Sequence, residues 1–140
     1  MDKTTLANEL RQIDEAMSSN FAVIEDMFSN PLSATMQGCM FPKGHKQLLW
    51  ELRTRCVKDS VNKVTALDPS YGKSLSDLFA INIVAPIQKL EDYLGSQDLG
   101  QSGGLKCMHD YRDKIREIDY NGKIRPKIHA WIKEIENANA

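Results

Sequence analysis

The stretch TTLANELRQIDEAMSSNFAVIEDMF, residues 4–28, decides the fold class of this chain. Its apolar side chains follow one another in steps of three or four residues: Leu6, Leu10, Ile13, Met17, Phe21, Ile24 and Phe28. Such steps line up along one face of an α-helix. Thr4 or Thr5 can cap the helix, and Asn30-Pro31 ends it. We predict one long amphipathic helix here.

Two more segments have helical spacing. Residues 45–67 carry Leu48, Leu49, Leu52, Cys56, Val61, Val64 and Leu67, and Asp68-Pro69, Tyr71 and Gly72 then predict a turn. The third helix is expected to start at a Ser74 or Ser76 cap and to end at Gly95. Pro86 lies inside this third helix. A proline there removes a backbone hydrogen bond, which predicts a kink between Asn82 and Pro86.

The last segment begins near Leu105, and Asn121-Gly122 followed by Pro126 interrupts its pattern, so we expect a break there. Residues 31–44 and 95–104 are predicted loops. No segment alternates as a strand would. We therefore predict an all-α fold, a four- to five-helix antiparallel bundle with a kinked third helix and a broken last helix. Residues 1–140 form a single domain in this prediction.

Composition excludes several classes of protein. The chain of 140 residues is 41% apolar and 26% charged, too apolar for a disordered segment. Its net charge of −1 argues against a globally basic nucleic-acid binder. No apolar run approaches the roughly 20 residues that a membrane span needs. The first twenty residues lack the apolar core of a signal peptide, and the three cysteines are widely spaced, so we expect a cytoplasmic protein.

Charge alternates along the chain, with balances of −4, +4, −3 and +2 over residues 1–30, 31–63, 64–105 and 106–140. One interpretation is attraction between antiparallel neighbours. The other is a basic face that meets the phosphates of a lipid or a nucleic acid. The candidates for that face are Lys43, Lys46, Arg53, Arg55, Lys58, Lys63, Lys123, Arg125 and Lys127.

Few residues could carry chemistry. The possible zinc ligands are Cys39, His45, Cys56, Cys107 and His109, whose spacing does not form the close pairs of a zinc site. Cys107 could be activated in the first turn of a helix, but His109 would lie on another face. The segment Arg125-Pro-Lys-Ile-His129 is similar to ribonuclease helices that place an arginine ahead of a histidine, yet it is one residue short. We assign no catalytic or metal-binding residue and expect no cofactor.

The surplus apolar residues point to a partner. Trp50 lies at the edge of its helical stripe, and Met36, Met40 and Phe41 lie in a predicted loop. Tryptophan off the main stripe is enriched at interfaces, whereas Trp131 is expected in the core. We therefore expect a non-enzymatic interaction module, an adaptor, regulator or assembly subunit, that binds another protein or a second copy of itself.

A resemblance supplies the alternative. The stretches Val84-Ala-Pro-Ile-Gln-Lys-Leu90 and Tyr111-Arg-Asp-Lys-Ile-Arg-Glu-Ile-Asp-Tyr120 resemble, in style, helices of BAR-type membrane-curvature domains. The chain is short for that family, and Gly122 and Pro126 break a helix that should stay long. The resemblance implies peripheral binding to an anionic membrane through the basic face. Association with nucleic acid is the less favoured third possibility.

Overall fold

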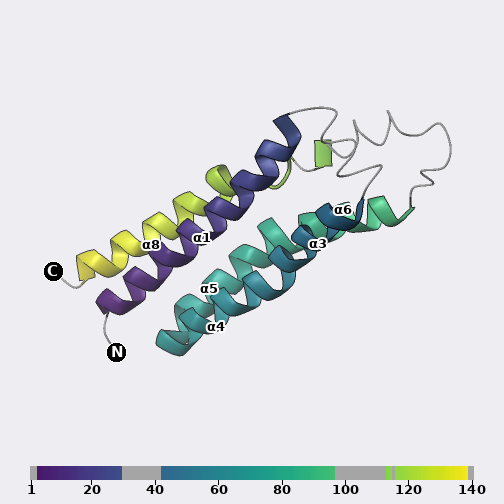
Figure 1. Ribbon diagram of the computed structural model, residues 1–140. Helices are drawn as coiled ribbons and strands as arrows, with labels where there is room; N and C mark the ends of the chain where they lie inside the picture. Colours follow the sequence, from purple (N-terminus) through teal and green to yellow (C-terminus); the bar gives the residue numbers. More distant parts are fainter. Residues whose placement is uncertain (1–2, 30–41, 97–112, 115, 139–140) are drawn as a thin grey trace.

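Four antiparallel helical rods make up a computed structural model that describes residues 3–29, 42–96, 113–114 and 116–138 (Figure 1). The first rod is α1 (Lys3–Ser29). The second joins α3 (Pro42–Glu51), the π-helical η2 (Leu52–Cys56) and α4 (Val57–Leu67). The third joins α5 (Pro69–Phe79), η3 (Ala80–Val84) and α6 (Ala85–Ser96), and the fourth joins η4 (Tyr120–Ile124) and α8 (Arg125–Ala138). No strand occurs in these residues, so the predicted all-α class is confirmed.

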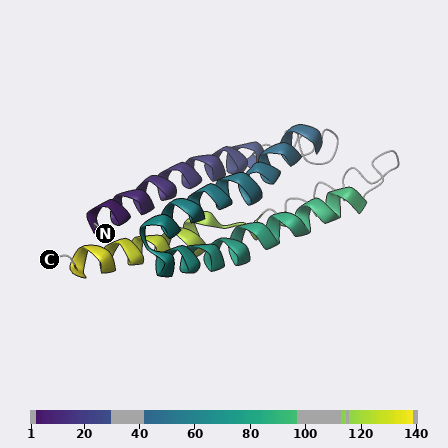
Figure 2. The same ribbon diagram turned by 90° about the horizontal axis from the view of Figure 1, so that it is seen from below.

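The rods run up, down, up and down around one core. Helix α1 packs against both α4 and α8, and α4 packs against α5. Figures 1 and 2 show α1 beside α8, the α4–α5 hairpin next to them, and both chain ends at the same end of the bundle. No described helix is long and apolar enough to cross a membrane.

The stripe on α1 faces this core, as its spacing predicts. Leu6, Leu10, Ile13, Met17, Phe21 and Ile24 are all buried, whereas the side chain of Phe28 lies outside the described residues. The other rods bury Leu49, Leu52, Val64, Leu75, Phe79, Ile83, Ile87, Leu90, Ile124, Ile128, Ile132 and Ile135 against it. Burial of a large aliphatic side chain stabilises a fold by about 1.5–3 kcal/mol, so this core is the main source of stability.

Two prolines are tolerated inside rods because a wide helical turn precedes each. Ala85 N–H donates to the carbonyl of Ala80, five residues back, just before Pro86. Arg125 N–H donates to Tyr120 in the same way, just before Pro126. A π-type turn relieves the clash and the lost donor that proline brings. Where we predict a kink between Asn82 and Pro86, the structure has π-helical turns over Ala80–Val84.

The predicted turn after residue 67 is wrong in extent. Helix α5 begins at Pro69, not at Ser74 or Ser76, because Asp68 caps it by accepting hydrogen bonds from the backbone of Ser70 and Tyr71. Gly72 therefore lies within the helix and against α4. A Cβ atom at Gly72 would lie 2.7 Å from the Cα of Thr65, so only glycine fits this crossing.

The predicted break in the last segment is displaced. Asp119 caps the fourth rod by accepting a hydrogen bond from the Gly122 N–H, so the chain turns before residue 120. Residues 121, 122 and 126, where we predicted the interruption, lie inside the helix. Helix α3 likewise begins at Pro42, three residues before the predicted start. The remaining parts of the predicted loops, residues 31–41 and 97–104, and the start of the last segment near Leu105 lie outside the described residues.

Candidate functional site

The partner-binding candidate Trp50 lies on the outside of α3. Its side chain is 48% exposed, whereas Leu49 and Leu52 on either side are buried in the core. Met36, Met40 and Phe41 lie outside the described residues. Trp131 is half-buried against the core. Its ring lies edge-on to the ring of Tyr71, with the two ring centroids 6.2 Å apart.

The candidate basic residues are divided between two rods. Arg53, Arg55, Lys58 and Lys63 lie on η2 and α4, and Lys123, Arg125 and Lys127 lie on η4 and α8. Helix α1 packs against both α4 and α8 and lies between them. Arg53 forms an ion pair with Glu91, with 2.9 Å between Arg53 Nε and Glu91 Oε1. Arg55 forms an ion pair with Glu51, with 3.5 Å between Arg55 Nη2 and Glu51 Oε2. The side chains of Lys43 and Lys46 lie outside the described residues. The structure thus places these cations on two different rods.

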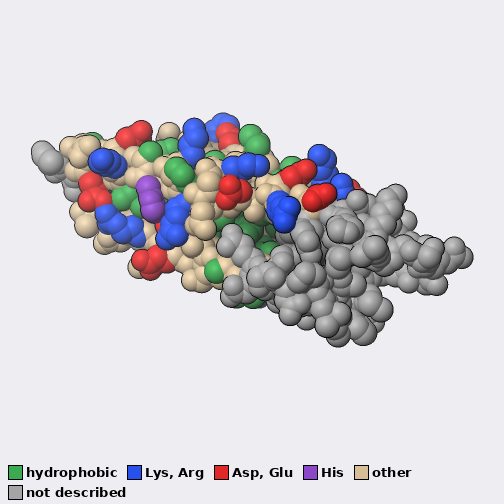
Figure 3. Space-filling model, turned by 90° about the horizontal axis from the view of Figure 1, so that it is seen from above, with side chains coloured by type: hydrophobic (Ala, Val, Ile, Leu, Met, Phe, Trp, Pro, Cys, Tyr) green, Lys and Arg blue, Asp and Glu red, His purple; other side chains and the backbone are tan. Residues whose placement is uncertain are grey.

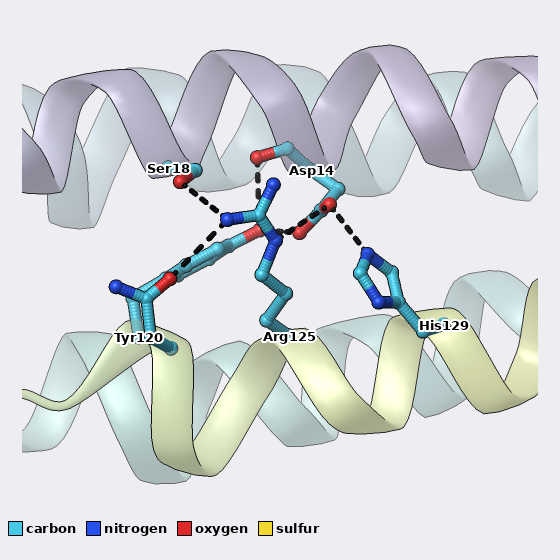
Figure 4. Close-up of polar contacts among 6 residues, drawn as sticks. Asp14, Ser18, Tyr120, Arg125 and His129 are labelled. Carbon is cyan, nitrogen blue, oxygen red and sulfur yellow. Dashed lines mark hydrogen bonds and ion pairs between the residues drawn. The ribbon is translucent and has the colours of Figure 1, made fainter.

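The most organised polar site is one that the sequence analysis did not assign, a carboxylate buried between α1 and the fourth rod. The side chain of Asp14 is only 4% exposed. Its Oδ1 accepts a hydrogen bond of 2.8 Å from the Tyr120 hydroxyl, and its Oδ2 accepts one of 3.2 Å from Arg125 Nε. His129 Nε2 lies 2.9 Å from the same Oδ2. Figure 4 shows these three side chains reaching Asp14 from the fourth rod.

The helix spacing explains how this site forms. Asp14 follows Leu10 by four residues, which places it on the buried face of α1. A buried carboxylate is costly unless donors compensate for its lost hydration. Tyr120 and Arg125 stand at the two ends of the π-type turn, and His129 lies one α-turn beyond. Arg125 Nη1 also donates to Ser18 Oγ at 3.1 Å, which ties the rod to α1 a second time.

Tyr120 is the buried anchor of this site. It is 1% exposed, and its ring stacks on Phe21 with centroids 5.3 Å apart. Burial raises the pKa of Tyr120 strongly, and the hydrogen bond to Asp14 raises it further. The phenol therefore stays protonated and serves as a permanent donor to Asp14.

A groove of about 570 Å³ opens beside Asp14, between α1 and α8. It is lined by Arg11, Asp14, Glu15, Arg125, His129, Ile132, Lys133, Glu136 and Asn137. Arg11 and Glu136 form an ion pair across it. Figure 3 shows a histidine side chain at the surface, with basic and acidic side chains close around it. A volume of this size suits a small molecule.

The candidate metal and thiol residues are not assembled in the described part of the chain. Of the five possible ligands only the side chain of Cys56 lies within it, half-buried on η2. Burial raises the pKa of the Cys56 thiol, which disfavours the reactive thiolate. No group of three or more histidine, cysteine or carboxylate side chains that could hold a metal ion occurs among the described residues.

Comparisons with protein-family models, with curated proteins and with solved structures find no match to this chain. The site must therefore be interpreted from its own geometry. One signal in the sequence could have revealed it, namely a carboxylate on the apolar stripe of residues 4–28. The Arg125-to-His129 spacing, considered for a ribonuclease-like helix, proves to place both side chains on this carboxylate.

Proposed function

We propose that this chain is a non-enzymatic helical interaction module, an adaptor, regulator or assembly subunit, whose partner protein or second copy contacts Trp50. The exposure of Trp50 carries the proposal, because a tryptophan left 48% exposed on a helix leaves a large apolar area in water. Tryptophan is among the residues most enriched in binding hot spots.

The neighbourhood of Trp50 supports this assignment. Leu49 on α3 and Leu52 at the start of η2 are buried in the core, so the backbone that carries the indole is fixed before any partner arrives. A preorganised side chain loses less conformational entropy on binding than a mobile one. Glu51 and Arg55 form an ion pair one helical turn apart, which offers a polar rim beside the indole.

Membrane or nucleic-acid binding has less support in the structure than the interaction module. The basic side chains that would serve it are divided between two rods, and Arg53 and Arg125 are held in ion pairs with Glu91 and Asp14. A vesicle assay still tests the point directly. Binding to anionic vesicles that disappears as ionic strength rises would favour a membrane role over the interaction module.

Site-specific photo-crosslinking tests the interaction module. A photoreactive amino acid replaces Trp50 in one variant and the exposed Lys63 on α4 in a matched control. We expect a discrete crosslinked species, either a homodimer or a complex with one other protein, from position 50 only. Replacement Trp50→Ala should weaken that complex about 30-fold or more, as truncation of a hot-spot residue does. Equal crosslinking from both positions, or none from either, would contradict the proposal.

A further inference from the structure

The groove between α1 and α8 contains ion pairs, and several hydrogen-bond donors in it have no partner among the described residues. Asp14 is saturated by Tyr120, Arg125 and His129. Arg11 is bound to Glu136. Among the described residues, Lys133 forms no ion pair with any carboxylate, although its side chain lines the groove.

The α8 wall of the groove is a basic stripe. Arg125, His129 and Lys133 follow one another at intervals of four residues and all line the groove. Four residues of α-helix rise about 6 Å, so neighbouring side chains of this stripe can contact one small ligand together. Asp14 anchors the first two of these side chains, and their outer atoms are left for a ligand.

The two nitrogens of His129 have different environments. Nε2 lies 2.9 Å from the buried Oδ2 of Asp14. Nδ1 has no partner among the residues that the structure describes, and the side chain is 56% exposed to solvent. When the imidazole is protonated, both nitrogens donate, one to Asp14 and the other outward. Arg125 is similar, because Nε and Nη1 are engaged by described residues and Nη2 is not.

We propose that this groove is a binding site for a small, singly charged oxyanion, such as a carboxylate or a phosphate diester. The oxyanion is held by Nδ1–H of His129, by the ammonium group of Lys133 and by Nη2 of Arg125. Charge-assisted hydrogen bonds from such donors are the usual means of oxyanion recognition. The site lies on α1 and α8, away from Trp50 on α3, so it is independent of the proposed interaction surface.

The charge of the groove favours a ligand with a single negative charge. Its lining includes the cations Arg11, Arg125 and Lys133 and the carboxylates Asp14, Glu15 and Glu136, which balance. Protonation of His129 then leaves one net positive charge. A polyanion should be repelled by Glu15.

The test follows the His129 ring by NMR while inorganic phosphate or acetate is added to the full chain at about pH 6, at constant ionic strength. We expect a saturable shift of the His129 signals. Lys133→Gln should weaken binding about threefold or more, and Glu15→Gln should strengthen it, because each changes one charge beside the ligand. Lys127→Gln, an exposed change on α8 outside the groove lining, is the matched control and should leave binding unchanged.

Each outcome is informative. A stronger response to phosphate identifies a phosphate diester as the ligand class, and a stronger response to acetate identifies a carboxylate. No saturable shift with either anion would overturn the proposal. Equal weakening by Lys133→Gln and Lys127→Gln would also overturn it, since that result means an adventitious ion only. Circular dichroism of each variant separates lost binding from lost folding, and none of these results depends on Trp50.

Discussion

Replacement Tyr120→Phe tests whether the buried carboxylate links α1 to the last rod. The change removes one hydroxyl and keeps the ring that stacks on Phe21. A hydrogen bond to a charged group contributes about 1.5–3 kcal/mol to stability. Asp14 keeps its contacts with Arg125 and His129, so the lower part of that range applies. We expect a loss of about 2 kcal/mol in the free energy of unfolding.

The assay is urea unfolding followed by circular dichroism at neutral pH. For a chain of 140 residues the same loss corresponds to a fall of about 7 °C in Tm. The matched control is Tyr71→Phe, which removes a hydrogen bond of 3.2 Å to Glu134 on the surface and should cost about 0.5 kcal/mol or less. Equal losses in free energy of unfolding in the two variants would refute the argument that burial increases the contribution of the Tyr120 hydrogen bond to stability.

The same variant should also change how the free energy of unfolding depends on pH. Burial raises the pKa of Tyr120 above its ordinary value, so the folded chain keeps a proton that the unfolded chain gives up above about pH 10. Stability of the natural chain therefore falls there by about 1.4 kcal/mol per pH unit through this one group. The Tyr120→Phe variant lacks that loss. The difference of about 2 kcal/mol in free energy of unfolding between the natural chain and the variant should therefore close near pH 11.5. A difference that stays constant up to that pH would contradict the assignment.

Three further predictions concern the fold and the thiol. Gly72→Ala should cost about 1–3 kcal/mol in urea unfolding, because the new Cβ would lie 2.7 Å from the Cα of Thr65. Asp68→Ala should cost about 1 kcal/mol by the same measurement, since the cap of α5 is lost. In a variant whose other cysteines are serine, Cys56 should react with a thiol reagent at neutral pH more slowly than a free cysteine peptide, because burial raises its pKa.

The sequence predicts the helices well where packing and local pattern agree. The apolar stripe of residues 4–28 becomes the buried face of α1, because a period of 3.6 residues has only one way to bury its large side chains. Pro86 predicts a kink for a similarly local reason, a missing donor and a steric clash, and the structure meets that condition with a π-helical turn.

Prediction fails where a contact from a distant element decides. Ser74 and Ser76 are reasonable caps, but α5 begins earlier because Asp68 caps it, and Gly72 then lets the helix cross α4 at Thr65. The break before Tyr120 depends on Asp119 as a cap, which is one of several local signals in the last segment. The exposure of Trp50 also follows from which face of α3 the core covers.

By itself, the sequence determines the all-α class and the buried face of each long helix, since these follow from side-chain periodicity along a single helix. Only the tertiary structure reveals the site at Asp14. Its donors Tyr120, Arg125 and His129 lie more than 100 residues away along the chain. A carboxylate on an apolar stripe is stable only when such donors reach it, and that condition depends on how the rods pack against one another.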